Sequence, residues 1–270
     1  MNKLKKLLKA ILLIISKPSL LNNVLNNPNV SRAEVIKKYN LPQGLKTIDI
    51  QLLLPDLNET IEPYSSLDGG STPIDITLLK ALAKSKADCD YFEIGTWRGE
   101  SVANVASVAK HCVTLNLPDA QMQQMGLDKN YIASHRFFSK DLKNVTHIQA
   151  DSQTFDYSSL DQKFDLIFVD GDHHYESVKT DTSNVFNLLK NEDSIIVWHD
   201  YGNNPGDIRW DVLHGIMDGT PMDKRRYLYR VSNTLCAIYL KRPIESSYIR
   251  PYSSPENCFS LTVKHNNSKG

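Results

Sequence analysis

Residues 91–101 carry the pattern of a strand, a tight glycine loop and a helix start. A short apolar run ends at the acid Glu93, and Gly95 and Gly99 then bracket the loop. Ser101 opens a segment rich in alanine and valine, which predicts a helix. In a doubly wound α/β sheet, such a strand-to-helix turn is where a nucleoside-type cofactor binds.

Further apolar runs of strand length follow along the chain, separated by helical or loop segments. This alternation predicts βαβ units and a mostly parallel sheet. A helix is predicted before the first strand, at residues 77–84. The predicted later strands are 112–117, 145–150, 164–169 and 194–198, with a final hairpin at 227–231 and 234–240.

Polar residues stand where the predicted strands end. In an open α/β sheet, the ligand crevice lies outside the carboxyl ends of the strands, so these side chains are expected to converge. Any one of them could instead be a turn or cap residue, because Asp and Asn are common in both. The set is Glu93, Asn116, Asp151, Asp170, His199 and Asp200.

The glycine loop has the spacing Gly95-x-x-x-Gly99, which differs from the GxGxxG fingerprint of dinucleotide sites. Trp97 and Arg98 occupy its middle, where a pyrophosphate would need close backbone approach. The loop therefore favours a cofactor without a pyrophosphate over NAD or FAD. The plainer alternative is a tight turn with no ligand.

Charge and cysteine content narrow the class of protein. The 270 residues contain 31 Lys+Arg and 31 Asp+Glu, so there is no basic surplus for nucleic-acid binding. The four cysteines are far apart and form no CxxC pair. This argues against a disulfide framework and favours a cytoplasmic location.

The N-terminal segment is basic and amphipathic. Lysines precede and oppose an apolar stripe in residues 3–15, which is too short to span a bilayer. The favoured interpretation is a helix packed on its own protein or on a second subunit of a homo-oligomer. The alternative is peripheral contact of residues 1–17 with an anionic membrane surface. A second helical stretch is expected within 20–39, where Ser31-x-x-Glu34 reads as a capping box.

Three separated motifs resemble those of class I S-adenosylmethionine-dependent methyltransferases. They are Phe92-Glu-Ile-Gly-Thr-Trp-Arg-Gly-Glu-Ser101, Phe168-Val-Asp-Gly-Asp-His-His-Tyr-Glu-Ser-Val-Lys179 and Ile196-Val-Trp-His-Asp-Tyr201. More narrowly, they are similar to the group related to macrolide-sugar O-methyltransferases and cephalosporin hydroxylase-like proteins. The resemblance covers roughly residues 72–240.

This resemblance implies an α/β, Rossmann-like domain with a mostly parallel seven-stranded sheet and helices on both faces. The expected division is a helical N-terminal extension at 1–71, the methyltransferase domain at 72–242 and a polar extension at 243–270. The implied cofactor is S-adenosylmethionine. Its methionine and ribose parts would be bordered by Glu93, Gly95, Thr96, Gly99, Ser101 and Asp170.

The remainder of the implied cofactor site is at the next two strand ends. Asn116 stands where the family usually has an acid that binds both ribose hydroxyls. An amide can accept one hydrogen bond and donate another, so ribose binding can survive this change. Asp151 and Ser152 match positions beside the adenine.

Asp170 and Asp200 end neighbouring strands and could hold one hard divalent cation, with Mg²⁺ as the first candidate. In the resembling sugar O-methyltransferases, the residue before the second aspartate is a metal-binding acid, whereas here it is His199. Imidazole prefers softer metals. Three alternatives follow: His199 is not a ligand, the metal differs, or the site has no metal.

His173 matches the proposed general base of the family, and an imidazole suits proton removal near neutral pH. The plainer alternative is that His173 or His174 caps the following helix. Further polar and aromatic residues could line an acceptor pocket or belong to an ordinary surface loop. They are Tyr201, Asn203, Asn204, Arg209 and Trp210.

The function these features predict is O-methyl transfer to a hydroxyl of a sugar, glycan or related small molecule, assisted by a metal. Asp-x-Asp-His-His with a downstream His-Asp pair raises the alternative of a metal-dependent hydrolase. A non-catalytic binding protein on the same fold is the third interpretation, supported by Asn116 and His199.

Overall fold

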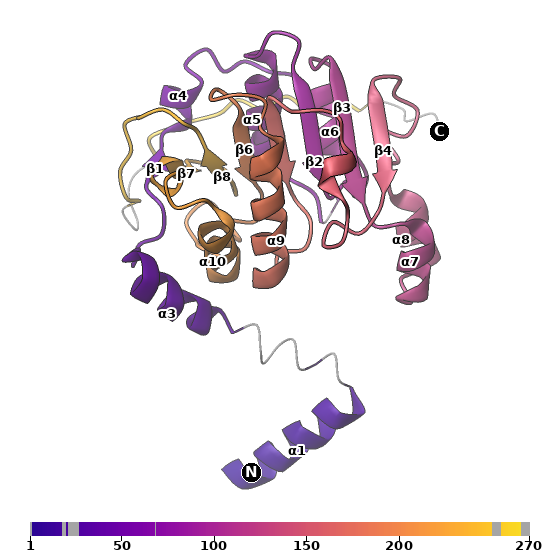
Figure 1. Ribbon diagram of the computed structural model, residues 1–270, viewed down its shortest axis with the longest axis vertical. Coiled ribbons are helices and arrows are strands. Elements are labelled where there is room, and N and C mark those ends of the chain that lie inside the picture. Colours follow the sequence, from indigo (N-terminus) through magenta and orange to yellow (C-terminus); the bar gives the residue numbers. More distant parts are fainter. Residues whose placement is uncertain (1, 18–19, 21–26, 68, 250–254, 266–270) are drawn as a thin grey trace.

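The computed structural model describes residues 2–17, 20, 27–67, 69–249 and 255–265. Within them, eight strands form one sheet in the order β1-β7-β8-β6-β5-β2-β3-β4 (Figure 1). The strands are β1 Thr47–Ile48, β2 Asp90–Ile94, β3 His111–Asn116, β4 Val145–Gln149, β5 Leu166–Val169, β6 Ile195–Trp198, β7 Leu228–Val231 and β8 Ala237–Tyr239. The α-helices are α1 Lys3–Ser16, α3 Pro28–Tyr39, α4 Ile50–Leu53, α5 Pro73–Lys84, α6 Glu100–Ala106, α7 Asp119–Gln124, α8 Lys129–Ser134, α9 Tyr175–Val185 and α10 Trp210–Gly219. Short 3₁₀ helices occur at Tyr157–Ser159, Phe186–Leu188 and Arg225–Tyr227.

The strands β2 to β6 are all parallel, so their carboxyl ends share one edge of the sheet. The chain runs outward from β2 through β3 to β4, and then returns to the other side of β2 with β5 and β6. The topological switch point therefore lies between β2 and β5. Ligands of open α/β sheets bind at such a point.

All seven predicted strands are present, but the predicted number of strands is wrong, because β1 adds an eighth. β1 pairs in parallel with β7 at the edge of the sheet, through Thr47 with Arg230 and Ile48 with Val231. A strand of two residues shows no alternation of polar and apolar positions, so no sequence period marks it. β8 is antiparallel to both β6 and β7, as expected for a final hairpin.

Alternate residues of each central strand enter two different hydrophobic cores. Phe92, Ile167 and Ile196 pack with α9 and α10 on one face of the sheet. Tyr91, Phe168 and Val197 pack with α5 and α6 on the other. This period of two is what a sheet covered on both faces requires, and it confirms the three-layer arrangement seen in Figure 1.

The N-terminal helices differ in how they relate to this domain. Helix α3 packs on α10, and the described residues from Leu45 to Leu53 contribute buried side chains to both cores. Helix α1 stands apart from the domain (Figure 1), and none of its residues is buried. Among the described residues, no helix is long and apolar enough to cross a membrane. The division at residues 71 and 242 stays a prediction.

The predicted capping box at Ser31 is wrong. Helix α3 begins one turn earlier, at Pro28, and the Asn27 side chain caps it by accepting a hydrogen bond from the Asn29 N–H. Proline is favoured at this first position because its ring fixes a helical φ. Ser31 lies inside the helix, and its hydroxyl donates to Asp211 of α10. The part of the predicted 20–39 stretch at 21–26 falls outside the described residues.

Candidate active site

The loop after β2 is fixed by a glycine that no other residue could replace without a shift of the backbone. Gly95 has φ +86°, and a Cβ placed there would lie 1.9 Å from the backbone oxygen of Asp170. Positive φ is a conformation that glycine adopts at no steric cost. The ends of β2 and β5 are therefore in direct contact at the switch point.

Three buried polar side chains in or beside this loop have an atom without a hydrogen-bond partner in the described part of the chain. They are Trp97 Nε1, Glu93 Oε1 and Thr96 Oγ1. The other carboxylate oxygen of Glu93 accepts from the Tyr91 hydroxyl at 2.6 Å, and Ser101 also hydrogen-bonds to this side chain. Burial raises the pKa of Glu93 to about 8. Buried polar atoms are rarely left unpaired, so the two oxygens, Glu93 Oε1 and Thr96 Oγ1, mark a candidate ligand position.

The central residues of the loop turn toward the protein. The Arg98 Nε donates to Glu100 at 3.3 Å, and its Nη2 donates to the Leu67 carbonyl at 3.2 Å. The Trp97 ring packs against Tyr131 of α8, with ring centroids 4.2 Å apart. Arg98 therefore stabilises the loop itself rather than facing outward as a phosphate ligand.

The ends of β3 and β4 continue this half of the site. Asn116 accepts from the Thr96 N–H at 3.2 Å and donates to the Leu117 carbonyl at 3.2 Å, so its amide holds the two strand-end loops together. Asp151 caps its own turn by accepting from the Gln153 N–H at 3.0 Å. These contacts bring Asn116 to the glycine loop.

A further buried acid, Asp181, lies beside Ser152 and is not predicted from the sequence. Asp181 is 1% exposed on α9, and its side chain is hydrogen-bonded to Ser152 and Gln153. Burial raises its pKa to about 7. A single Asp inside a helical pattern carries no sequence signal that separates it from a surface acid.

The ends of β5 and β6 bring together Asp170, His199 and Asp200. The Nδ1 of His199 lies 3.0 Å from Asp170 Oδ1 and 3.8 Å from Asp200 Oδ1. The three ligand atoms lie within 4.8 Å of one another, as ligands of one metal ion would. The predicted convergence of these three residues is confirmed.

A fourth residue, Asp75 of α5, completes this cluster from the other side of the imidazole. Its Oδ2 lies 3.3 Å from His199 Nε2, and its side chain is fully buried. Burial alone would lower the pKa of His199, but the carboxylates of Asp170, Asp200 and Asp75 together raise that pKa well above its usual value. In the sequence, Thr72-x-x-Asp75 signals only a helix cap, a role that the structure also shows.

The donor set is suitable for a divalent cation. Imidazoles that bind metals usually donate their other N–H to a carboxylate, and Asp75 is placed to receive it. One nitrogen and two carboxylates suit Mn²⁺ or Zn²⁺ better than Mg²⁺, which prefers oxygen ligands alone. Without a metal, a proton on His199 would satisfy the same carboxylates, because the ring is then an imidazolium that lies between them.

Two further cationic or titratable side chains face Asp200. Arg209 Nη1 lies 2.8 Å from its Oδ1, and His173 Nδ1 lies 3.9 Å from its Oδ2. His199 and Arg209 overcome the effect of burial and lower the pKa of Asp200 to about 2. Burial and Arg209 lower the pKa of His173, so His173 is neutral near pH 7. The neighbouring His174 stacks on His173 and contacts Asp172.

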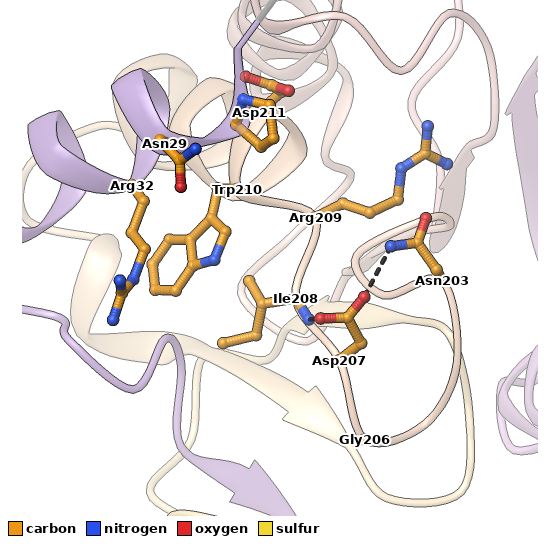
Figure 2. A pocket seen from close by; sticks show the side chains of 10 residues that line it. Asn29, Arg32, Asn203, Gly206, Asp207, Ile208, Arg209, Trp210 and Asp211 are labelled. Atoms are coloured by element: carbon orange, nitrogen blue, oxygen red, sulfur yellow. Dashed lines mark hydrogen bonds between the residues drawn. The ribbon is translucent and has the colours of Figure 1, made fainter.

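A cavity of about 640 Å³ lies beside this cluster, between the start of α3 and the loop that leads into α10. Figure 2 shows Asn203, Arg209 and Trp210 on its wall. Two further residues predicted for an acceptor pocket, Tyr201 and Asn204, do not line this cavity. Tyr201 is buried and accepts from the Leu45 N–H, while Asn204 accepts from the Gly206 N–H of its own turn.

One family model matches part of the chain. Residues 92–201 match a family model described as a methyltransferase domain. A search of curated proteins gave no match.

Solved structures with a similar fold include three methyltransferases. The S-adenosylhomocysteine-bound PaMTH1 of Podospora anserina is 17% identical, with 67% of this chain and 83% of that chain covered and a TM-score of 0.48. A candidate caffeoyl-CoA O-methyltransferase from Staphylococcus aureus is 18% identical, with 70% and 95% covered and a TM-score of 0.46. CalS11, a TDP-rhamnose 3'-O-methyltransferase of calicheamicin biosynthesis, is 15% identical, with 62% and 77% covered and a TM-score of 0.40. Likeness at this level says nothing of the substrate.

Three observations indicate a methyltransferase domain. They are the sequence motifs, the switch point between β2 and β5, and the family match. Residues 92–201 thus match a methyltransferase domain, and they lie in a Rossmann-like fold.

Proposed function

We propose that this protein is an S-adenosylmethionine-dependent O-methyltransferase that acts on a hydroxyl of a sugar or related glycan-type acceptor. The observation that carries the proposal is the position of two unpartnered buried atoms, Glu93 Oε1 and Thr96 Oγ1, beside the charged cluster at the ends of β5 and β6. The first group offers partners for a cofactor, and the second offers the means to activate a hydroxyl.

In this proposal, the cofactor supplies an electrophilic methyl group on a sulfonium. Glu93 becomes a carboxylate facing the cationic amino group of the methionine part, and Asn116 faces the ribose hydroxyls. Asp151 and Ser152 border the adenine. Gly95, Thr96, Gly99, Ser101 and Asp170 form the wall between them.

His173 is the proposed general base. It is neutral near pH 7 because burial and Arg209 lower its pKa, so it can accept a proton. As the acceptor oxygen bonds to the methyl carbon and the sulfur–carbon bond breaks, the hydroxyl proton passes to His173 Nε2. Asp200 lies 3.9 Å from the other ring nitrogen, where its charge favours the protonated imidazole.

A divalent cation held by Asp170, His199 and Asp200 belongs to the proposal. Such an ion would lower the pKa of a hydroxyl that binds it. The histidine in the donor set favours Mn²⁺ over the Mg²⁺ first expected. Adding EDTA should lower methyl transfer, and Mn²⁺ should restore it better than Mg²⁺. Unchanged activity in EDTA would exclude the ion.

Calorimetric titration with S-adenosylhomocysteine tests the cofactor assignment. Binding at micromolar to sub-millimolar concentration is expected, and the absence of heat at millimolar ligand would overturn the proposed function. Metal-dependent hydrolysis is not favoured by a specific observation, because the described residues offer one three-ligand group where two-metal hydrolases need more.

Helix α1 favours an additional partner, an anionic membrane surface. Its exposed apolar residues form one stripe and its lysines lie mostly opposite, which is typical of helices that lie in a membrane interface. Each lysine near an anionic surface contributes about 1 kcal/mol of attraction. The stripe consists of Leu4, Leu7, Leu8, Ile11, Leu12 and Ile15, while Leu13, which is also exposed, lies on the lysine side.

Flotation with vesicles tests this partner. The chain should float with vesicles that contain phosphatidylserine and remain behind with phosphatidylcholine alone. Leu8→Glu should abolish flotation, whereas Met222→Glu, at an exposed apolar residue of the domain, should not. If Leu8→Glu instead converts a dimer to a monomer on a sizing column and leaves flotation unchanged, α1 contacts a second subunit.

A further inference from the structure

A buried arginine holds the backbone of the loop that connects β6 with α10. Arg230 of β7 is 3% exposed, and its backbone N–H donates to the Lys46 carbonyl beside β1. Its Nη2 donates to the Asn204 carbonyl at 3.3 Å and also to the Pro205 carbonyl. Among the residues that the structure describes, no carboxylate forms an ion pair with this guanidinium. Two carbonyls of the loop are therefore the acceptors for a buried charge.

The loop, residues 201–209, is also closed at its two ends. The Arg209 N–H donates to the Tyr201 carbonyl at 2.8 Å, and the Tyr201 hydroxyl accepts from the Leu45 N–H at 2.9 Å. The guanidinium carbon of Arg230 lies 5.6 Å from the centre of the Tyr201 ring. Tyr201 thus fixes the ends of the loop, and Arg230 fixes the part between them.

This loop connects two groups of the charged cluster. It begins directly after Asp200, whose φ of +57° is a left-handed conformation that is costly for a residue other than glycine. It ends at Arg209, whose Nη1 lies 2.8 Å from Asp200 Oδ1. Such a backbone conformation persists only where surrounding contacts hold it. The contacts of Arg230 with the loop are suited to this task.

We propose that Arg230 is a positioning residue for methyl transfer, which acts by holding the 201–209 loop so that Arg209 stays paired with Asp200. The inference rests on the proposed function, because it adds a residue to the same site. Arg230 acts through the loop and not by contact with the reacting atoms. A buried guanidinium is costly unless its N–H groups are hydrogen-bonded, so the arginine and the loop stabilise each other's positions.

Hydrogen exchange followed by mass spectrometry tests this role without turnover. Arg230→Met keeps the apolar stem and removes every donor, so exchange in peptides from 201–209 should become at least about tenfold faster. Peptides from the glycine loop at 91–101 should exchange as before. Arg230→Lys keeps a charge and a donor and should show a smaller change, and it replaces the methionine variant if that variant does not fold. Unchanged exchange in 201–209 would overturn the proposal.

Thr47 offers a matched control at the same edge of the sheet. It is the residue of β1 that pairs with Arg230 of β7, and its hydroxyl has no hydrogen-bond partner within the described residues. Thr47→Val has a similar shape and should leave the exchange of the loop unchanged. An equal effect of Thr47→Val and Arg230→Met would show that the loop responds to any change at this edge, and would overturn the assignment to the guanidinium.

Kinetics with labelled cofactor separates positioning from a general loss of stability. With an acceptor that the unaltered chain methylates, Arg230→Met should lower kcat about tenfold or more and leave the KM of the cofactor within about twofold. Arg209→Ala should lower kcat in the unaltered chain and have little further effect in Arg230→Met, because Arg209 has then already lost its place beside Asp200. Losses that simply multiply would overturn the proposed role.

Titration of the same samples with S-adenosylhomocysteine separates this inference from the proposed function. If S-adenosylhomocysteine binds and Arg230→Met leaves the exchange of the loop unchanged, the proposed function stands and the role of Arg230 fails. If S-adenosylhomocysteine binds to none of the samples, the proposed function fails and the catalytic role of the loop fails with it. The exchange of 201–209 then still decides whether Arg230 holds the loop.

Discussion

The two halves of the strand-end region differ in how their buried polar groups are satisfied. At β2 and β3, Glu93 Oε1 and Thr96 Oγ1 have no hydrogen-bond partner within the described residues. At β5 and β6, His199 lies between Asp170 and Asp75, and Asp200 is paired with Arg209. The first half has the polar atoms that a ligand would satisfy, and the second half is held in place by its own charges. Substitutions in the first half should therefore lower the affinity for the ligand, and substitutions in the second half should lower activity or stability.

The largest effect is expected from His173→Ala. Loss of a general base lowers the rate of methyl transfer about 10²- to 10⁴-fold, with binding of S-adenosylhomocysteine unchanged. His174→Ala is the matched control, because the two rings stack and are similarly exposed. The rate is measured with labelled cofactor and an acceptor that the unaltered chain methylates. An equal loss in both variants would contradict the role of His173.

Asp75→Asn should be the most destabilising polar substitution in the second half. Asparagine keeps the shape but leaves His199 with one fewer carboxylate, and breaking a buried ion pair costs about 3 kcal/mol. The free energy of unfolding is measured with urea. Thr72→Ala removes the helix cap, including the hydrogen bond that the Thr72 hydroxyl donates to Asp75 Oδ2 at 2.7 Å, at a cost of about 1 kcal/mol, and shows how much of the loss is due to capping. Equal losses would mean that Asp75 acts as a cap alone.

Glu93→Gln should weaken binding of S-adenosylhomocysteine about tenfold and yet stabilise the free protein. The pKa of Glu93 is about 8 in the folded state, above its usual value of 4.5, so the folded protein retains a proton that the unfolded chain releases. The unaltered protein therefore loses stability as the pH rises from 4.5 to about 8, and the glutamine variant does not share this loss. Thermal unfolding across this range should show a widening difference in favour of Glu93→Gln. A difference that is constant with pH would contradict the raised pKa.

The smallest effect is expected from Asn116→Asp. The substitution restores the acid that the resembling family has at this position, and a charged acceptor strengthens hydrogen bonds from ribose hydroxyls. Affinity for S-adenosylhomocysteine should rise by up to about tenfold. The Thr96 N–H can still donate to the new carboxylate, as it does to Asn116. Weaker binding in calorimetry would mean that the ribose does not lie against β3.

The main elements and much of the candidate site could be predicted from sequence for a physical reason. Parallel strands covered on both faces read as apolar runs, and their ends meet at one edge, so Asp170, His199 and Asp200 could be brought together without coordinates. The strand β1 could not be predicted, because two residues carry no period. Its place in the sheet is set by contacts with β7, which is about 180 positions later in the chain.

The role of Asp75 could not be predicted from the sequence either. The helix predicted at 77–84 begins four residues too late, since α5 starts at Pro73. The missing first turn contains Asp75, whose pairing with His199 depends on the fold and not on any local pattern. Arg209 is similar. Its place in the sequence suggests a role in an acceptor pocket, whereas its ion pair with Asp200 depends on how the loop after β6 folds.

The carboxylate of Asp75 also accepts a hydrogen bond from the Leu235 N–H at 2.8 Å, in the turn between β7 and β8. One side chain thus joins helix α5, the histidine that follows β6 and the last hairpin. During synthesis from the N-terminus, Asp75 gains this hydrogen bond only after residue 235 has left the ribosome and β8 has inserted beside β6. A shortened version that ends between Arg209 and β7 would contain every proposed catalytic residue and Asp75, and would lack this anchor on the Asp75 carboxylate.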